Sequence, residues 1–306
     1  MMNAQPVVAT RGLSKFYNHV CRVNNINLEV LEGEIYGFLG PNGAGKSTTL
    51  KMLLGLAKPT DGRITLFGQE LGKHRRTVLN QIGSLIESPS YYGHLTGLEN
   101  MRVMQKLRGV PSKNVEEALR IVRLENQKNK QVEHYSLGMK QRLGIAMALI
   151  SYPKLLILDE PTNGLDPAGI GEIRELIKSL PRQYGITVLL SSHLLSEIEQ
   201  IATSVGIISD GNLLYQGKME TLQERNRSSL AIRTSNNTAA AAWMQNQGYM
   251  ASLRDECLQI KHMSDQQVAR LNKELVLSGI DVLRIEERKR TLEDIFLELT
   301  GRERSL

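Results

Sequence analysis

The sequence predicts an α/β fold whose core is a mainly parallel sheet. Three apolar runs of strand length, at residues 154–159, 186–192 and 205–210, each end in polar residues. Between them we expect helices, one after Pro167 and one after His193. Apolar strands that alternate with helices indicate a parallel sheet with both faces covered.

Two further segments complete this first domain. Residues 7–38 predict short strands, because residues 20–30 (VCRVNNINLEV) alternate apolar and polar positions, and we expect an antiparallel N-terminal β subdomain. Residues 96–150 predict a helical insert, opened by a capping box between Thr96 and Glu99. Four apolar residues of this insert share one helix face: Val115, Ala118, Leu119 and Val122.

A change of pattern near residue 222 predicts a second, smaller domain. The polar segment QERNRSS is typical of a linker. After it, short strands alternate with helices around residues 239–247 and 266–277, which predicts a small α+β domain. We therefore expect two domains, residues 1–221 and 222–306.

The bulk composition excludes several classes of protein. Of 306 residues, 41% are hydrophobic and 23% charged, as in an ordinary soluble domain, and the net charge of +6 suits nucleic acid, an anionic ligand or a membrane surface equally. Two cysteines, Cys21 and Cys257, are too few for a disulfide framework or a metal cage, which favours a reducing cytosol. The N-terminal segment predicts no secretory signal, and the apolar run 145–150 is far shorter than the ~20 residues of a membrane helix. A role at a membrane therefore requires a partner.

A glycine-rich segment carries the strongest chemical pattern. GPNGAGKS matches G-x-x-x-x-G-K-[ST], follows an apolar strand and opens a helix, so a chance glycine-rich turn is disfavoured. Its backbone N–H groups and the helix N-terminus suit a triphosphate, Lys46 would reach the β- and γ-phosphates, and the Ser47 hydroxyl would bind Mg²⁺. The candidate residues for binding ATP are Gly40, Pro41, Asn42, Gly43, Ala44, Gly45, Lys46, Ser47 and Thr48.

A second pair of candidates ends the strand LLILDE. Asp159 emerges at the carboxyl end of this strand, where it would hold Mg²⁺ through water. Glu160 would polarise the attacking water as general base. Apolar runs that end in Asp-Glu are common by chance, so these two residues alone leave a structural explanation open.

Four more segments make the chain resemble the ATP-binding cassette (ABC) ATPases. Together with the two motifs above, they follow the order of that family's motifs between residues 17 and 193. YSLGMKQRLG resembles the family signature L-S-G-G-Q, with Ser136 and Gly138 retained. GLDP, with Asp166, resembles the loop that crosses the dimer interface, and His193 in SSHLLSE resembles the histidine that contacts the γ-phosphate. Tyr17 in LSKFY resembles the aromatic residue that stacks on adenine. Each alone has a structural explanation, such as a surface aromatic, a strand-end histidine or a helix cap, but their order and spacing favour the family.

The resemblance covers about residues 7–221 and implies an enzyme that binds ATP and Mg²⁺ and hydrolyses ATP. It further implies a homodimer of cassettes, in which each ATP lies between the phosphate loop of one chain and Ser136 and Gly138 of the other. A separate transmembrane permease would hold the dimer peripherally at the cytoplasmic face of the cell membrane. Met139 stands where the signature has glutamine, so one polar contact of that site is changed.

Glu87 points to one branch of the family. Glutamine usually ends the strand before the helical insert, whereas here IESPSYYGHLTGLEN resembles cassettes of exporters for lantibiotics and bacitracin-like peptides. The tail TLEDIFLELTG, with an amphipathic pattern over residues 292–299, resembles the same group. We expect Glu87 to act in catalysis and at Mg²⁺ by accepting from metal-bound water, and residues 88–94 to meet the permease. The alternative is that Glu87 is only the polar end of the strand 82–86.

Three other functions remain open from the sequence. A soluble cassette ATPase that acts on nucleic acid or ribosomes suits the basic pI of about 9.2, but such chains usually carry two cassettes or long coiled-coil inserts. An import ATPase with a regulatory C-terminal domain is disfavoured by the Glu87 segment and the tail. An exporter for another substrate shares every feature above. We therefore expect a peptide-antibiotic exporter subunit, conferring resistance or immunity, with no nucleic-acid partner.

Overall fold

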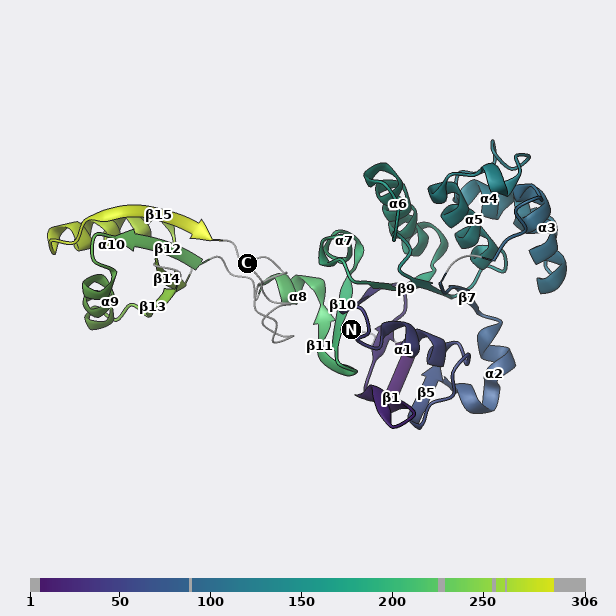
Figure 1. Ribbon diagram of the computed structural model, residues 1–306, viewed down its shortest axis with the longest axis horizontal. Helices are drawn as coiled ribbons and strands as arrows, with labels where there is room; N and C mark the ends of the chain where they lie inside the picture. The colour runs from purple at the N-terminus through teal and green to yellow at the C-terminus, as the bar shows by residue number, and fades with distance from the viewer. Residues whose placement is uncertain (1–5, 88–89, 225–228, 255–256, 262, 289–306) are drawn as a thin grey trace. The chain divides into compact units, whose positions relative to one another are not determined.

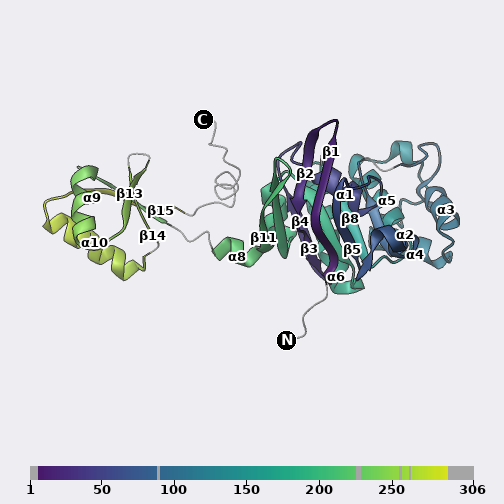
Figure 2. The ribbon, with the colours of Figure 1, turned by 90° about the horizontal axis from the view of Figure 1, so that it is seen from below.

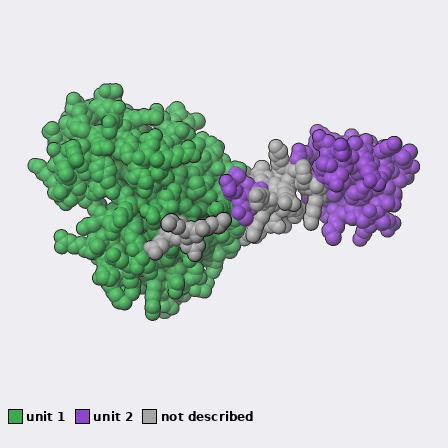
Figure 3. Space-filling view, turned by 180° about the vertical axis from the view of Figure 1, so that it is seen from behind, with its two compact units in different colours: residues 1–219 green, residues 220–306 purple. Residues whose placement is uncertain are grey.

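The computed structural model divides the chain into two compact units, Met1–Met219 and Glu220–Leu306 (Figures 1 and 3). The division lies two residues before the predicted domain end at residue 221. The structure describes the chain apart from residues 1–5, 88–89, 225–228, 255–256, 262 and 289–306. The helix expected over 291–301 lies outside the described residues. Within them, no helix has the length and apolar character needed to cross a membrane.

The core of the first unit is a six-stranded sheet with the order β11-β10-β4-β9-β8-β7. Every neighbouring pair is parallel except β10 and β11, which confirms the predicted mainly parallel sheet. All residues of β4, β8, β9 and β10 are buried, as their apolar sequences predict. The strands are β4 (Ile35–Leu39), β7 (Ile82–Leu85), β8 (Leu155–Asp159), β9 (Thr187–Ser192), β10 (Ser204–Ser209) and β11 (Asn212–Lys218).

An antiparallel sheet forms from the N-terminal part of the chain, with the order β2-β1-β5-β6 and β3 paired to β1. Its strands are β1 (Pro6–Tyr17), β2 (Val20–Ile26), β3 (Glu29–Leu31), β5 (Asp61–Leu66) and β6 (Gln69–Glu70). β1 is one long strand with irregular register near Leu13, not a series of short ones. Helix α1 (Lys46–Leu53) lies beside β1 and β5 (Figures 1 and 2), and one cluster of buried residues joins it to both sheets.

The helical insert contains α3 (Gly97–Arg108), α4 (Lys113–Ile121), the 3₁₀ helix η1 (Val132–His134) and α5 (Leu137–Leu149). The capping box is present, because Thr96 accepts from the Glu99 backbone while the Glu99 side chain accepts from Thr96 N. The remaining helices of this unit are α6 (Pro167–Tyr184) and α7 (Leu195–Ile201), which follow β8 and β9 as predicted, and α2 (Leu71–Leu79).

The second unit is a small α+β fold with its own core. After α8 (Met219–Glu224), its elements are β12 (Ser229–Thr234), α9 (Asn237–Asn246), β13 (Ala251–Arg254), β14 (Cys257–Lys261), α10 (Asp265–Leu277) and β15 (Val282–Arg288). The sheet has the order β13-β14-β12-β15, and every pair is antiparallel. The core joins Ile232 and Leu258 of the sheet to Met244 of α9 and to Leu271 and Leu275 of α10.

Candidate nucleotide site

Three neighbouring parallel strands end at the same edge of the core sheet. Leu39 of β4 pairs with Ser192 of β9, and Ser191 of β9 pairs with Asp159 of β8. The segments that follow carry the phosphate loop, Glu160 and His193. Carboxyl ends of parallel strands are the usual location of ligand sites in such sheets, so the topology brings together motifs that are far apart in the sequence.

The backbone of the phosphate loop requires glycine at two positions. A Cβ on Gly45 would lie 2.5 Å from Arg22 O, and the φ of +107° at Gly45 is in the region that side chains disfavour. A Cβ on Gly40 would collide with Ile208 O. Ala44 O accepts from Gly211 N at 3.0 Å, which ties the loop to the turn after β10. Gly45 caps α1 without a side-chain hydrogen bond, so the first N–H groups of this helix face the loop and suit an anion.

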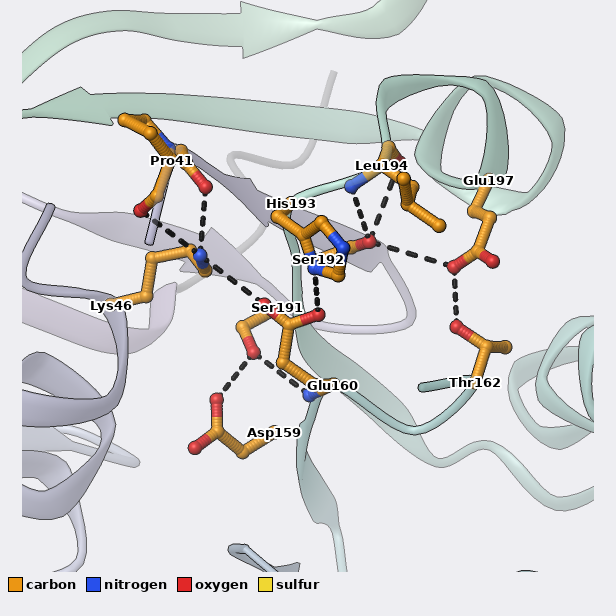
Figure 4. Close-up of polar contacts among 11 residues, drawn as sticks. Pro41, Lys46, Asp159, Glu160, Thr162, Ser191, Ser192, His193, Leu194 and Glu197 are labelled. Atoms are coloured by element: carbon orange, nitrogen blue, oxygen red, sulfur yellow. Dashed lines mark hydrogen bonds and ion pairs between the residues drawn. The ribbon is translucent and has the colours of Figure 1, made fainter. Parts of the chain in front are cut away.

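Lys46 is the buried cation of the loop. Its side chain is 5% exposed, and Nζ donates to Gly40 O at 2.7 Å and Pro41 O at 3.3 Å (Figure 4). Nζ also forms an ion pair with Glu160 Oε1 at 3.2 Å. A triphosphate in this loop would compete with Glu160 for the same ammonium group, which links phosphate binding to the freedom of the carboxylate.

Glu160 and His193 form a hydrogen-bonded pair beside a second carboxylate. His193 Nδ1 lies 2.7 Å from Glu160 Oε2. Asp159 is buried, and its Oδ1 accepts from Ser191 Oγ at 2.5 Å, while Ser191 Oγ accepts from Glu160 N at 3.0 Å. Glu160 has a φ of +50°, which is uncommon outside glycine and typical of strained functional positions. The arrangement suits a general base oriented by an imidazole.

An open pocket of about 440 Å³ joins these groups. It is lined by Arg22, Pro41, Asn42, Gly43, Gly45, Lys46, Ser47, Thr48, Glu160, Asn163 and His193. Sequence reasoning missed Arg22 and Asn163. Asn163 lies between Glu160 and Asp166, so its position in the sequence could have identified it. Arg22 reaches the pocket only because β2 lies against the loop, and no local sequence pattern predicts that contact.

The oxygen atoms available at the pocket fit Mg²⁺, which binds partly through phosphates and waters, better than they fit a metal that is held by protein ligands alone. The described part of the chain has no cluster of three or more His, Cys, Asp or Glu side chains that would hold a metal. Mg²⁺ typically binds through one or two protein oxygens together with phosphates and waters. The Ser47 hydroxyl in the pocket and the Asp159 carboxylate at the end of β8 are such oxygens.

Glu87 is placed differently from the other candidates. β7 ends at Leu85, and Glu87 follows with a φ of +61° and is exposed. Its Oε1 accepts from Lys51 Nζ of α1 at 2.6 Å. This hydrogen bond, together with the lysine's charge, holds the pKa of the Glu87 carboxyl below its usual range and raises the pKa of Lys51. Glu87 is therefore charged and paired with a helix that begins in the phosphate loop, and it is not among the residues that line the pocket.

Gly40, Ala44 and Asp159 belong to the segments that form the pocket but are not among its lining residues, and four predicted residues from other segments do not line it either. Tyr17, at the end of β1, is 46% exposed, and the Lys15 ammonium lies 4.7 Å from the centre of its ring. Ser136 caps α5 by accepting from Met139 N at 3.2 Å, and Gly138 lies in the first turn of that helix. Asp166 caps α6 by accepting from Gly169 N. A single chain therefore does not bring the signature segment to its own phosphate pocket.

Comparisons with known proteins assign this geometry to a family. A family model for ABC transporters matches residues 23–163. The bacitracin transport ATP-binding protein BcrA of Bacillus licheniformis is 46% identical over 300 residues, which are 96% of this chain and 97% of that protein. The chain belongs to the ABC transporter ATP-binding proteins. It is an ATPase, and this membership confirms the family inferred from the order of the motifs.

Two further comparisons refine the position of this cassette ATPase. The lantibiotic transport ATP-binding protein SrtF of Streptococcus pyogenes is 45% identical over 218 residues, which are 70% of this chain and 93% of that protein. A solved dimeric ATP-binding cassette, in a post-hydrolysis state with ADP and Pi, matches with a TM-score of 0.63 at 27% identity, over 69% of this chain and 98% of that chain. The bacitracin and lantibiotic branch predicted from the segment around Glu87 is confirmed by these relatives.

Proposed function

We propose that this cassette ATPase drives the export of a bacitracin-like peptide antibiotic through a separate permease and so protects the cell that makes the protein. The observation that carries the proposal is the pocket in which Lys46, Glu160 and His193 meet, in a chain that matches the bacitracin relative over almost its whole length. The pocket supplies the ATPase chemistry, and the match to the bacitracin relative supplies the substrate class.

The residues of the pocket divide the chemistry among them. The loop backbone and Lys46 bind the phosphates, because N–H donors and an ammonium group stabilise the charge that develops during transfer. Ser47 and Asp159 would hold Mg²⁺, which neutralises phosphate charge. Glu160 accepts a proton from the attacking water, and His193, 2.7 Å from Glu160 Oε2, fixes the orientation of that carboxylate.

We further propose that two copies act together head to tail. Ser136 is exposed at the start of α5 and lies outside the pocket of its own chain, as Gly138 does. A second copy would bring these residues to the phosphates and complete the site. The solved cassette with ADP and Pi is dimeric, which supports the pairing of two copies. Tyr17 would then stack on the adenine at the rim.

A second groove suits the membrane partner. Its volume is about 320 Å³, and it lies between the end of β7 and the helices α3 and α5. Apolar side chains dominate its lining, including Leu56, Ile86, Met104 and Met147. Ile86 is the residue immediately before Glu87. An amphipathic helix of a permease would place its apolar face there. The cassette would then lie peripherally at the cytoplasmic face of the membrane.

The extent of the two matches favours a bacitracin-like peptide over a lantibiotic. The bacitracin relative matches 96% of this chain, which includes the C-terminal unit, whereas the lantibiotic relative matches 218 residues, about the length of the first unit. A soluble ATPase that acts on nucleic acid or ribosomes stays the alternative, and the apolar groove argues against it.

Deletion and affinity capture test the proposal together. Deleting the chain from its own bacterium should lower resistance to bacitracin. The native chain should restore resistance and Glu160→Gln should not, while a control variant of the exposed Glu199, Glu199→Gln, should restore it. Capture of the tagged chain should recover a protein with several membrane-spanning helices. Unchanged resistance would refute the substrate class, and recovery of ribosomes or nucleic acid instead would support the alternative.

A further inference from the structure

A third acidic side chain near the site has no role in the chemistry above. Glu197 lies on α7, and it is 7% exposed. Its Oε2 accepts a short hydrogen bond from Thr162 Oγ1 and lies 3.5 Å from Ser192 Oγ (Figure 4). Its Oε1 is buried without a partner among the described residues. Burying a carboxylate is unfavourable unless hydrogen bonds compensate, so a leucine or glutamine would be the simpler choice for packing this helix.

The two hydroxyl groups at Glu197 belong to the two segments that carry the catalytic pair. Thr162 lies two residues after Glu160, and Ser192 lies immediately before His193. Figure 4 shows Glu197 on the far side of this pair from Lys46, with Ser192 between Glu197 and the pair and Thr162 beside Glu197. Glu197 therefore links the end of β8 to the end of β9 by side chains, beyond the last backbone pair of these strands at Asp159 and Ser191.

The Ser192 hydroxyl also holds the turn that carries His193. Leu194 is the residue before α7, and no side-chain hydrogen bond caps that helix. Leu194 N donates to Ser192 Oγ at 2.9 Å, so the hydroxyl that faces Glu197 also holds the backbone just after His193. On the other segment, the residue after Thr162 is Asn163, which lines the pocket.

We propose that Glu197 is a positioning residue that holds Glu160 and His193 at hydrogen-bonding distance. It acts through Thr162 and Ser192 and does not touch the substrate. Small displacements of catalytic groups lower rates strongly, since about 1 Å of misplacement can cost ~10²-fold. This inference rests on the roles proposed above for Glu160 and His193. The competing explanation is that Glu197 only anchors α7, in which case its loss would lower stability and leave turnover per folded molecule unchanged.

Steady-state kinetics of the full chain separate these explanations. Glu197→Ala should lower kcat by between ~10-fold and ~10²-fold and leave the KM for ATP within about twofold. Thr162→Val, which removes the hydroxyl and keeps a similar volume, should lower kcat in the same direction. Glu199→Ala on the same helix, whose side chain is exposed, is the matched control and should keep both constants. Melting temperatures are measured for every variant.

Double variants show whether Glu197 works through the catalytic pair. In a Glu160→Gln chain, adding Glu197→Ala should cause no further loss of turnover, because residues that act as one unit are not additive. A full multiplicative loss, or a normal kcat in a folded Glu197→Ala chain, would overturn the proposal. If Glu197→Ala does not fold, Thr162→Val decides: a lower kcat at an unchanged melting temperature supports the proposal, and an unchanged kcat overturns it. Normal turnover of Glu160→Gln would instead refute the proposed role of Glu160.

Discussion

Glu160 is the side chain on which most of the site converges. It forms an ion pair with Lys46 and a hydrogen bond with His193, and its backbone N–H donates to Ser191. A phosphate that attracts Lys46 would leave the carboxylate with His193 alone, which frees one oxygen to accept a proton. In the proposed mechanism the ion pair would couple the arrival of the substrate to the readiness of the base, and Lys46 would then matter for more than binding.

Removing the buried cation should abolish function. Lys46→Ala removes the ammonium group of the loop and leaves the Glu160 carboxylate facing the phosphates without compensation, so ATP binding or turnover should be lost. Lys58→Ala, at an exposed position on the same unit, should behave as the native chain. Nucleotide binding by calorimetry and phosphate release are the measurements. Near-normal ATPase activity of Lys46→Ala would contradict the assignment of the phosphate site.

Arg22 should contribute less to ATP binding than Lys46, and its contribution should depend more strongly on salt. It lines the pocket and is exposed, so Arg22→Gln should weaken ATP binding by about two- to fivefold, the range for one solvent-accessible charge contact. The difference from the native chain should shrink as ionic strength rises. The exposed Arg63, outside the pocket lining, supplies the control Arg63→Gln. Equal effects of the two variants would show that only net charge matters.

Among the secondary-structure elements, α1 connects the nucleotide pocket to Glu87. It begins at Lys46 in the phosphate loop and carries Lys51, whose ammonium lies 2.6 Å from Glu87. Ile86, the residue before Glu87, lines the apolar groove. One short helix therefore contacts both the nucleotide pocket and Glu87, the residue before the segment proposed to meet the permease.

The pairing of Glu87 with Lys51 can be measured by titration. The pKa of Glu87 lies below the ordinary value, so the carboxylate stays charged down to a lower pH than a free glutamate, and acidification through that pKa breaks the pair. Lys51→Met should raise the pKa of Glu87 to its ordinary value, whereas Lys58→Met should not change it. NMR titration of the labelled side chain tests this. An unchanged pKa in Lys51→Met would show that the pair does not form in solution.

The elements differ in how far the sequence predicts them. The buried parallel strands and the capped helix after Thr96 were predictable, because apolar runs and capping boxes are local patterns. α2 was not expected, since only Leu71 and Val78 of its nine residues are buried and its apolar pattern is weak. In the site, the glycine motif predicts the loop and Lys46. The ion pair of Glu87 with Lys51 depends on the tertiary approach of β7 and α1, which no local pattern specifies.

In the whole molecule, the two units have separate cores. The nucleotide pocket is lined only by residues of Met1–Met219, and the core of the second unit contains residues from 232 onward. The second unit therefore contributes no described side chain to the pocket or to the network of Glu197.

Truncation tests this separation. A chain that ends after Glu224 keeps α8 and loses the rest of the second unit, and it should bind ATP within about twofold of the full chain, because no pocket contact is removed. Its far-ultraviolet circular dichroism should lose only the contribution of the C-terminal elements. Loss of nucleotide binding in a folded truncated chain would show that the two units act as one domain.

The measurement that tests the central claim most directly is the rate of ATP hydrolysis by full-length Glu160→Gln. Glutamine keeps the size of the side chain but cannot accept a proton as a general base, so kcat should fall by ~10²-fold or more. ATP binding should be retained, and two copies should remain associated in the presence of ATP. Glu199→Gln provides the control and should hydrolyse ATP at the native rate. A native rate for Glu160→Gln would contradict the account, because another residue would then be the base.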